Sequence, residues 1–377
     1  MMLGNVVLFL VVIAFAWNLG VHYTGAVMGM PFAARAIALW PALALIGLLT
    51  ILGATFASGG VEETVGRHII TEQLVRVPDA IVIVLAAGAL TMLYNYYRIP
   101  TSTIQILVFC IVGVGLAGGI PIHWGTIAAL AVIWVTAPFV ACVLGFVFTR
   151  LLDRIVPPAA ARAEVQAQLA AGGAEASKIE KMEKAVPGGP LERAVPALAL
   201  ARHLPPSVLA AAGKAGAATR GALRLLPLLL VLVGMFASFV LGANDVSNAT
   251  GAFILTHQFP LEVAGLIGGI AMAVGSLTWG RRILHTVAFD VVKMDLSMAS
   301  AAQGVQALVV LVAVTQGYFT SMNQALIGAM AGTGLARGRE TVQRRQIIAI
   351  LRGWLIGPLS GFALAFALEL LVRATIR

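Results

Sequence analysis

The residues best suited to chemistry lie in one short stretch, Gly242–Phe253, which reads GANDVSNATGAF inside the apolar run 225–255. Five of its residues carry amide, carboxyl or hydroxyl groups: Asn244, Asp245, Ser247, Asn248 and Thr250. An ionised carboxylate in the middle of a bilayer costs several kcal/mol, so such a group faces a cavity or a polar partner and commonly serves transport. We interpret the stretch as a broken helix beside a water-lined site. A polar seam between packed helices is the alternative, although such a seam rarely needs an aspartate.

Three further polar stretches interrupt apolar segments, and they read as parts of the same site. They are Asn18–Thr24, Thr101–Gln105 and Thr320–Gln324. None of them contains Lys or Arg, and neither does Gly242–Thr250. A small anion held there would rest on helix N-terminal N–H groups, hydroxyl groups and side-chain amides. The composition of these stretches therefore favours binding of an anion by neutral donors.

Two of these stretches repeat one element. Thr101-Ser102-Thr103 and Thr320-Ser321 each precede an apolar run, which is where a helix N-cap residue belongs. Either element alone would indicate simple capping. The same element at two positions about 220 residues apart favours a duplicated binding loop.

The elements that position these residues are predicted to be membrane helices. The chain has 377 residues, of which 60% are hydrophobic and 11% are charged, whereas a soluble domain has about 25% charged residues. Apolar runs of about 20 residues recur, which is the length that crosses a bilayer. We predict an all-α polytopic membrane protein whose first and sixth segments are long and broken, and whose fourth and ninth are short and re-entrant. The ten segments are 6–30, 37–58, 79–97, 103–118, 126–149, 225–255, 262–279, 299–318, 322–335 and 346–372.

The ten segments divide into two similar halves. Gly20–Tyr23 aligns with Gly242–Asp245 at nearly the same offset that relates the two serine elements. We predict an N-terminal membrane repeat over 1–149, a cytoplasmic linker over 150–224 and a C-terminal membrane repeat over 225–377.

Five segments in each half is an odd number, so the halves should have opposite orientations in the membrane. Cytoplasmic loops are enriched in Lys and Arg. With the N-terminus outside, most of the 25 Lys and Arg fall in the linker or on its side of the membrane. Loop 118–123 has no basic residue, whereas the equivalent loop 336–346 has several. We therefore predict inverted-topology repeats in the cell membrane (the inner or plasma membrane), with the linker in the cytoplasm.

Charged residues outside the polar stretches are assigned to loops. We expect a solvated outer loop to hold Glu62, Glu63, Arg67, His68 and Glu72. We expect an inner gate or salt-bridge latch to be formed by Arg281, Arg282, Asp290, Lys293 and Asp295.

The polar motifs carry a family resemblance. GANDVSNATGAF resembles the GANDVANA signature of the inorganic phosphate transporter family, and Pro100–Thr103 and Phe319–Ser321 resemble the repeated PVSTT element of that family. The resemblance covers nearly the whole chain outside the linker. The first half departs from the phosphate carriers, because Tyr23 and Ala26 stand where these usually have an acid and an amide. That half is similar instead to the sulfate permease branch of the family.

The resemblance implies a secondary active importer of a tetrahedral inorganic oxyanion, working by H⁺ or Na⁺ symport with alternating access. Sulfate is the leading substrate and inorganic phosphate the alternative, because sulfate needs only donors whereas hydrogen phosphate also needs an acceptor. The sequence has no nucleotide-binding motif, so neither ATP nor another cofactor is expected. An anion channel and, less favoured, a membrane-embedded enzyme are the alternatives. The expected partners are the anion and the lipid bilayer, without nucleic acid, and a homodimer is left open.

Residue types suggest the individual roles. We expect the anion to contact hydroxyl, amide and backbone groups of Thr101, Ser102, Thr103, Thr320, Ser321, Asn323, Asn248, Gly20 and Gly242. We expect the coupling cation near Asp245, Asn244, Asn18, His22, Gln105 and Gln324. If the cation is Na⁺, Asp245 and Asn244 are its expected ligands. For His22, a packed and hydrogen-bonded histidine is an equally good interpretation.

Overall fold

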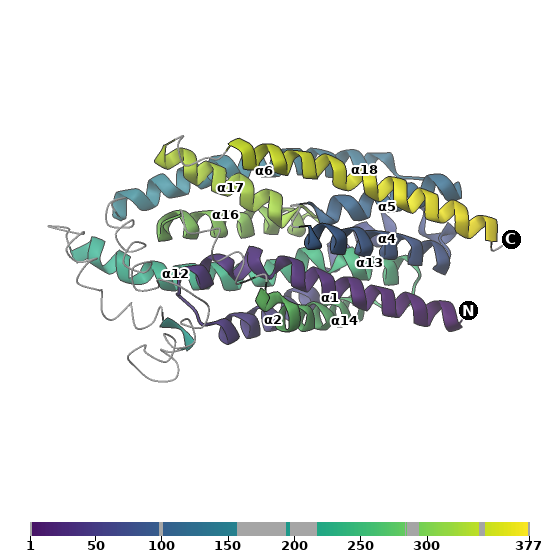
Figure 1. The fold of residues 1–377 in the computed structure, drawn as a ribbon, viewed down its shortest axis with the longest axis horizontal. Helices are drawn as coiled ribbons and strands as arrows, with labels where there is room; N and C mark the ends of the chain where they lie inside the picture. Colours follow the sequence, from purple (N-terminus) through teal and green to yellow (C-terminus); the bar gives the residue numbers. More distant parts are fainter. Residues whose placement is uncertain are drawn as a thin grey trace.

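The computed structural model is an elongated bundle whose helices run close to one long axis, with both chain termini at the same end (Figure 1). It describes residues 2–97, 101–156, 194–196, 217–282, 284, 294–338 and 344–375. These residues are helices and their connections, together with one isolated β-bridge between Ile70 and Ile122. The all-α prediction is therefore confirmed.

The first half of the chain supplies the helices α1 (Met2–Ala33), α2 (Leu39–Phe56), α3 (Gly59–Arg67), η1 (Glu72–Leu74), α4 (Val77–Tyr96), α5 (Thr103–Gly118) and α6 (Trp124–Ile155). The second half supplies α12 (Ala217–Asp245), α13 (Ser247–Leu255), α14 (Leu261–Gly275), the π-helical turn η2 (Ser276–Gly280), α16 (Leu296–Thr315), α17 (Met322–Arg337) and α18 (Arg344–Thr375).

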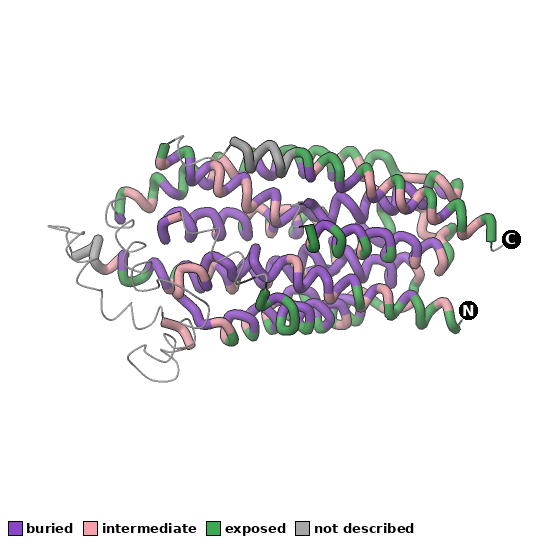
Figure 2. The backbone as a smooth tube through the Cα atoms, viewed as in Figure 1, coloured by how far each residue is buried: buried purple, intermediate pink, exposed green. Residues whose placement is uncertain are grey.

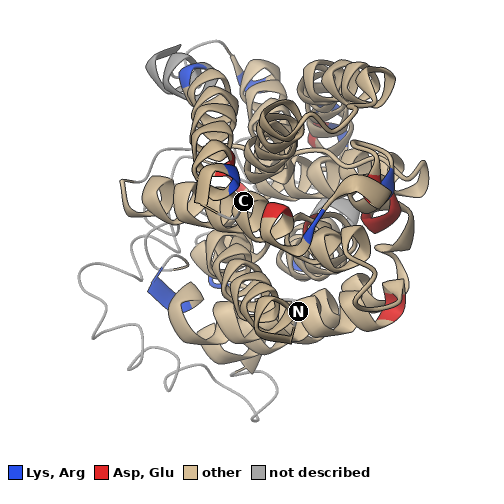
Figure 3. Ribbon diagram, turned by 90° about the vertical axis from the view of Figure 1, so that its right-hand side faces the viewer, with Lys and Arg blue, Asp and Glu red and all other residues tan. Residues whose placement is uncertain are grey.

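The outer surface of the bundle is apolar, as a lipid-facing surface must be. The described helices include eight that are long and apolar enough to cross a membrane. Large side chains such as Phe139 and Leu371 are 70% and 62% exposed, and exposed residues lie along the outside of the helices (Figure 2). Charged residues are few when the bundle is seen from the end that holds both termini (Figure 3). Polar groups that cannot meet water must find partners inside the bundle, and that need creates the polar interior described below.

Two helical hairpins meet inside the bundle. α4 packs beside α5, and α16 packs beside α17. The α4–α5 pair occupies the half of the bundle that holds the termini, and the α16–α17 pair occupies the other half (Figure 1). α5 packs along α18, and α17 packs along α6. This pairing agrees with the predicted duplication, whereas the opposite membrane orientation of the halves stays a prediction.

The long predicted segments are less broken than expected. α1 is one continuous helix from Met2 to Ala33 and passes through the polar stretch Asn18–Thr24 without interruption. The sixth segment is interrupted only at Val246, which keeps helical angles of φ −57° and ψ −38°. The predicted break was therefore wrong for the first segment and is confined to Val246 in the sixth, because the polar side chains bond to neighbouring helices and leave the helical hydrogen bonds in place.

The predicted solvated outer loop is wrong for Glu62, whereas Arg67 and His68 are exposed as expected. Residues 59–67 form the helix α3, and its Glu62 is fully buried rather than solvated. The linker 150–224 differs at both ends, because α6 continues to Ile155 and α12 begins at Ala217. Most of the linker lies outside the described residues.

Candidate functional site

The signature stretch forms a buried acid surrounded by neutral donors. Asp245 closes α12 and is fully buried. Its Oδ2 accepts a hydrogen bond from Asn244 Nδ2 at 2.9 Å, and its Oδ1 accepts one from Asn248 Nδ2 at 3.3 Å. The Tyr23 hydroxyl on α1 donates to the same carboxylate. Within the described ranges, the ion pairs of the protein do not include Asp245. The Asp245 carboxylate is thus bound by two asparagine amides and the Tyr23 hydroxyl, all of which are neutral.

Tyr23 connects this acid to the tip of the first hairpin. Its hydroxyl oxygen lies 2.7 Å from Thr103 Oγ1, and Asn248 Nδ2 donates to the same threonine oxygen at 3.3 Å. α1, α5 and α13 therefore converge through three side chains. In the phosphate carriers that this chain resembles, an acid stands at the position of Tyr23. In this protein the same position donates a hydrogen bond to Asp245.

The two hairpin tips are built alike. Ser102 caps α5 by accepting a hydrogen bond from Gln105 N at 3.3 Å, and Ser321 caps α17 by accepting one from Gln324 N at 3.3 Å. The amides of Gln105 and Gln324 then pair reciprocally across the tips, at 3.5 and 3.2 Å. A capping serine satisfies one of the first-turn N–H groups of a helix, and the others in that turn have no intrahelical partner. The predicted capping is confirmed at both positions, and the two helix N-termini meet.

Buried oxygen atoms without partners collect at these tips. Thr101 Oγ1, Thr320 Oγ1 and Asn248 Oδ1 are buried and have no hydrogen-bond partner. Buried polar atoms are otherwise almost always satisfied, so such a group calls for an explanation. An oxyanion between the tips would accept hydrogen bonds from the two threonine hydroxyls, whereas Asn248 Oδ1 needs a donor.

Asn244 holds the second tip against the signature helix. Its Nδ2 donates to Thr320 O at 2.8 Å, and its Oδ1 accepts from Thr320 N at 3.2 Å. The indole N–H of Trp134, on α6, donates to the carbonyl oxygen of the preceding residue, Phe319, at 3.2 Å. The tip of the α16–α17 hairpin is therefore fixed from two sides.

A second polar group lies on α1, α4 and α17. His22 Nδ1 bonds to Asn95 Oδ1, and His22 Nε2 lies 3.0 Å from Asn323 Nδ2. Asn95 Nδ2 also donates to Asn18 Oδ1 at 3.1 Å, and Asn18 donates to Gly88 O at 3.3 Å. These residues contact one another rather than Asp245. Asn95 was absent from the predicted site, although an asparagine in the apolar segment 79–97 is a recognisable signal.

Two predicted site glycines occupy points of close helix packing. A Cβ atom on Gly20 would lie 1.9 Å from Met272 O, and one on Gly242 would lie 2.1 Å from Thr50 O. No side chain larger than hydrogen fits at either position. Their role in holding the anion stays a prediction, and their visible role is to let α1 approach α14 and α12 approach α2.

Sequence reasoning missed a polar face on α16. Gln303 Nε2 donates to Ala26 O at 2.8 Å and lies 2.7 Å from Gln306 Oε1, and Gln306 donates to Met322 O at 3.3 Å. Gln303 Oε1 and Ser300 Oγ are buried without partners. These residues face the start of α17 and extend the polar interior away from the hairpin tips.

Charged clusters lie toward the two ends of the bundle. Arg337 Nη2, at the end of α17, lies 2.8 Å from Asp153 and 3.1 Å from Asp295, and it bonds to Ser297. Asp295 was expected in an inner gate or salt-bridge latch, and it is found in a salt bridge, whereas Arg281 and Arg282 are exposed. Asp290 and Lys293 lie outside the described residues.

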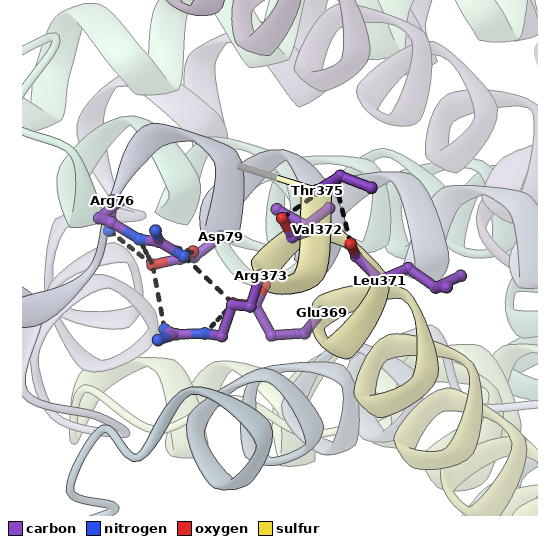
Figure 4. A network of polar contacts seen from close by, with 7 residues as sticks. All are labelled: Arg76, Asp79, Glu369, Leu371, Val372, Arg373 and Thr375. Atoms are coloured by element: carbon purple, nitrogen blue, oxygen red, sulfur yellow. Dashed lines mark hydrogen bonds and ion pairs between the residues drawn. The ribbon is translucent and has the colours of Figure 1, made fainter. Parts of the chain in front are cut away.

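The opposite cluster joins the start of α4 to the end of α18 (Figure 4). Arg76 Nη2 lies 2.7 Å from Asp79, and Arg373 Nε lies 2.6 Å from Glu369. Asp79 and Glu369 are fully buried, and a buried charge without a partner is strongly destabilising. Each acid is accordingly paired with an arginine.

Comparisons with known proteins identify the family and the fold. The model of the phosphate transporter family matches residues 19–376. Inorganic phosphate transporter 2-1, chloroplastic, of Arabidopsis thaliana is 25% identical over 405 residues, spanning 93% of this chain and 69% of that protein. Sulfate permease CysP of Bacillus subtilis is 23% identical over 356 residues, spanning 94% of this chain and 84% of that protein.

A solved structure described as the sodium-dependent phosphate transporter superposes with a TM-score of 0.77 at 20% identity, covering 99% of this chain and all of that chain. The likeness shows a shared fold. The family match covers nearly the whole sequence, including both hairpins and the signature stretch. The chain therefore belongs to the phosphate transporter family.

Proposed function

We propose that the protein is a secondary active importer of a tetrahedral inorganic oxyanion, with sulfate as its substrate and H⁺ or Na⁺ as the coupling ion. The observation that carries the proposal is the pair of capped helix N-termini that meet through Gln105 and Gln324, beside the buried hydroxyls of Thr101 and Thr320, which have no partners. Helix N-termini and hydroxyl donors bind oxyanions without fixed cations.

The preference for sulfate rests on Tyr23. Its hydroxyl donates its one proton to Asp245, so the first half of the site lacks the acceptor that an acid at this position would add. A fully deprotonated sulfate needs only donors. Hydrogen phosphate needs one acceptor as well.

Inorganic phosphate is the second candidate, and one atom favours it. Asn248 Oδ1 is a buried acceptor without a partner, and it could accept the proton of a hydrogen phosphate. The names of the Arabidopsis relative and of the superposed structure point the same way.

Cation coupling follows from electrostatics and from Asp245. Moving a dianion into a negative interior costs about 4.6 kcal/mol at 100 mV, and two co-transported monovalent cations cancel that cost. Asp245 is the one acid among the site residues that the signature and the hairpin tips bring together. For Na⁺, the carboxylate would exchange an amide donor for the ion, and Asn244 would have to release Thr320.

Uptake into proteoliposomes tests the proposal. Labelled sulfate and labelled phosphate are offered separately, with an imposed proton gradient, sodium gradient or neither. We expect sulfate to accumulate above its external concentration with one gradient, and selenate to compete more strongly than arsenate. Stronger competition by arsenate would favour phosphate. Downhill flux that no gradient can convert into accumulation would favour a channel, and flux of neither anion would contradict the proposal.

A further inference from the structure

A second buried acid lies outside the hairpin tips, on the short helix α3. Glu62 is fully buried, and its Oε1 lies 2.5 Å from Thr250 Oγ1 on α13. Its Oε2 has no hydrogen-bond partner. Thr250 belongs to the signature stretch but does not contact Asp245. The function proposed above makes no use of this pair.

The hydroxyl groups around Glu62 cannot supply the hydrogen bonds that an ionised carboxylate needs, because each has one proton and also contacts a backbone carbonyl. Thr250 Oγ1 lies within bonding distance of both Glu62 Oε1 and Val246 O, at 2.5 and 3.0 Å, but it has one proton to give. Ser58 also faces the carboxyl group, and its hydroxyl already donates to Ala54 O at 2.5 Å. A protonated Glu62 can donate to one of these oxygens while both hydroxyls keep their carbonyl partners, so every proton has an acceptor and no ionised carboxylate is left without a donor.

The electrostatic surroundings also favour the neutral acid. α3 packs against α12, α13, α14 and α16. α13 and α16 contain no ionisable residue, α12 ends at the acidic Asp245, and α14 brings Glu262, whose like charge acts on Glu62. On α3 itself, Glu63 pairs with Arg67 at 3.2 Å. Burial is the main cause that raises the pKa of Glu62 to about 7, and Glu262 adds to it.

α3 is placed to transmit a change at Glu62. A Cβ atom on Gly251 would lie 2.3 Å from Val65 Cγ1, so α3 rests directly on the signature helix α13. On another face, Thr64 Oγ1 lies 2.6 Å from Gly317 O, in the turn that leads to the second hairpin tip. α3 therefore bridges α13 and the α16–α17 hairpin.

We propose that Glu62 is a proton-binding site, separate from Asp245, and that its proton keeps α3 seated between α13 and the tip of the α16–α17 hairpin. Loss of the proton leaves a charge facing the Thr250 hydroxyl and Glu262, and it drives α3 away from α13. The link to transport rests on the function proposed above, whereas the proton site does not.

Infrared difference spectroscopy of the purified wild-type protein tests the proton site without any transport. The carbonyl stretching band of a buried, protonated carboxyl group should disappear as the pH rises through about 7. Glu62→Gln should remove one component of this band, while Glu63→Gln, a half-exposed acid on the same helix, should leave the band unchanged. Asp245→Asn removes any contribution of the other buried acid, and the Glu62 component should remain in that variant. Thr250→Val, which keeps the side-chain shape, should shift the Glu62 component. Absence of the band from wild type, or an unchanged band in Glu62→Gln, overturns the site.

Uptake into proteoliposomes tests the coupling. The protonated fraction of a group with this pKa changes about tenfold between pH 6 and pH 8, so the wild-type uptake rate should change several-fold over that range. Glu62→Gln imitates the protonated acid and should flatten the profile, whereas Glu63→Gln should not. A profile that stays steep in Glu62→Gln overturns the coupling. If wild type transports neither anion while the band behaves as expected, the transport function fails and the proton site stands.

Discussion

Replacing Asn244 with leucine is expected to detach the second hairpin tip from the signature helix. The Asn244 amide both donates to Thr320 O at 2.8 Å and accepts from Thr320 N at 3.2 Å. Leucine has a similar volume but offers neither group. Two buried backbone groups then lose their partners, and each unsatisfied group costs about 1–3 kcal/mol.

The expected loss of stability is therefore about 2–6 kcal/mol. Unfolding entropy of about 2.1 cal/mol/K per residue converts this loss into a fall in Tm of about 3–8 °C for a chain of this length. Thermal unfolding in detergent, followed by tryptophan fluorescence, measures the shift. Trp134 reports on the tip directly, because its indole donates to Phe319 O at 3.2 Å.

Asn323→Leu provides the matched control. Asn323 lies in the first turn of α17, is only partly buried and bonds to His22. Its loss leaves the Thr320 backbone paired, so the fall in Tm should be less than half as large. An unchanged Tm in Asn244→Leu, or equal falls in the two variants, would refute the reasoning.

Five further variants test the other groups. Asp245→Asn should abolish accumulation of anion against a gradient while exchange of internal for external anion continues, because the amide keeps the shape but cannot carry the charge; uptake assays with and without a gradient separate the two. Ser321→Ala should raise the KM of uptake about fivefold, since loss of an N-cap costs about 1 kcal/mol, and an unchanged KM would contradict its role. Arg337→Ala should lower the free energy of unfolding by about 3–5 kcal/mol, because two acids lose their buried partner, whereas Arg67→Ala, which breaks a half-exposed pair, should cost under about 1 kcal/mol; chemical denaturation compares them. The pKa of Glu62 is raised from 4.5 to about 7, so its contribution to stability is present below about pH 4.5 and is lost as the pH rises through about 7; that change, up to about 3 kcal/mol, should vanish in Glu62→Gln when unfolding is measured across this range.

Much of the fold could be predicted because a membrane restricts the choices. A run of about 20 apolar residues can only be a helix there, so the segments were found with their approximate boundaries. The capping serines Ser102 and Ser321 were found because an N-cap is a local feature of a few residues. The family followed from the signature stretch and the repeated serine element.

The sequence could not tell how the polar residues are divided among contacts. Asn18 and His22 were expected near Asp245, but they bond to Asn95 and Asn323. Gln105 and Gln324 were expected near a cation, but they bond to each other. Side chains of similar polarity compete for partners on other helices, and only the packing of those helices decides which partner is within reach.

Glu62 shows most clearly where local information ends. A glutamate in a short polar stretch between two apolar segments is ordinarily solvated, and so it was predicted. The amino-acid sequence by itself determined that the chain is a bundle of membrane helices with a duplicated, cation-free polar element. Tertiary structure alone decided which oxygens at the tips lack partners and which acids are enclosed, because burial depends on elements that are far apart in the chain.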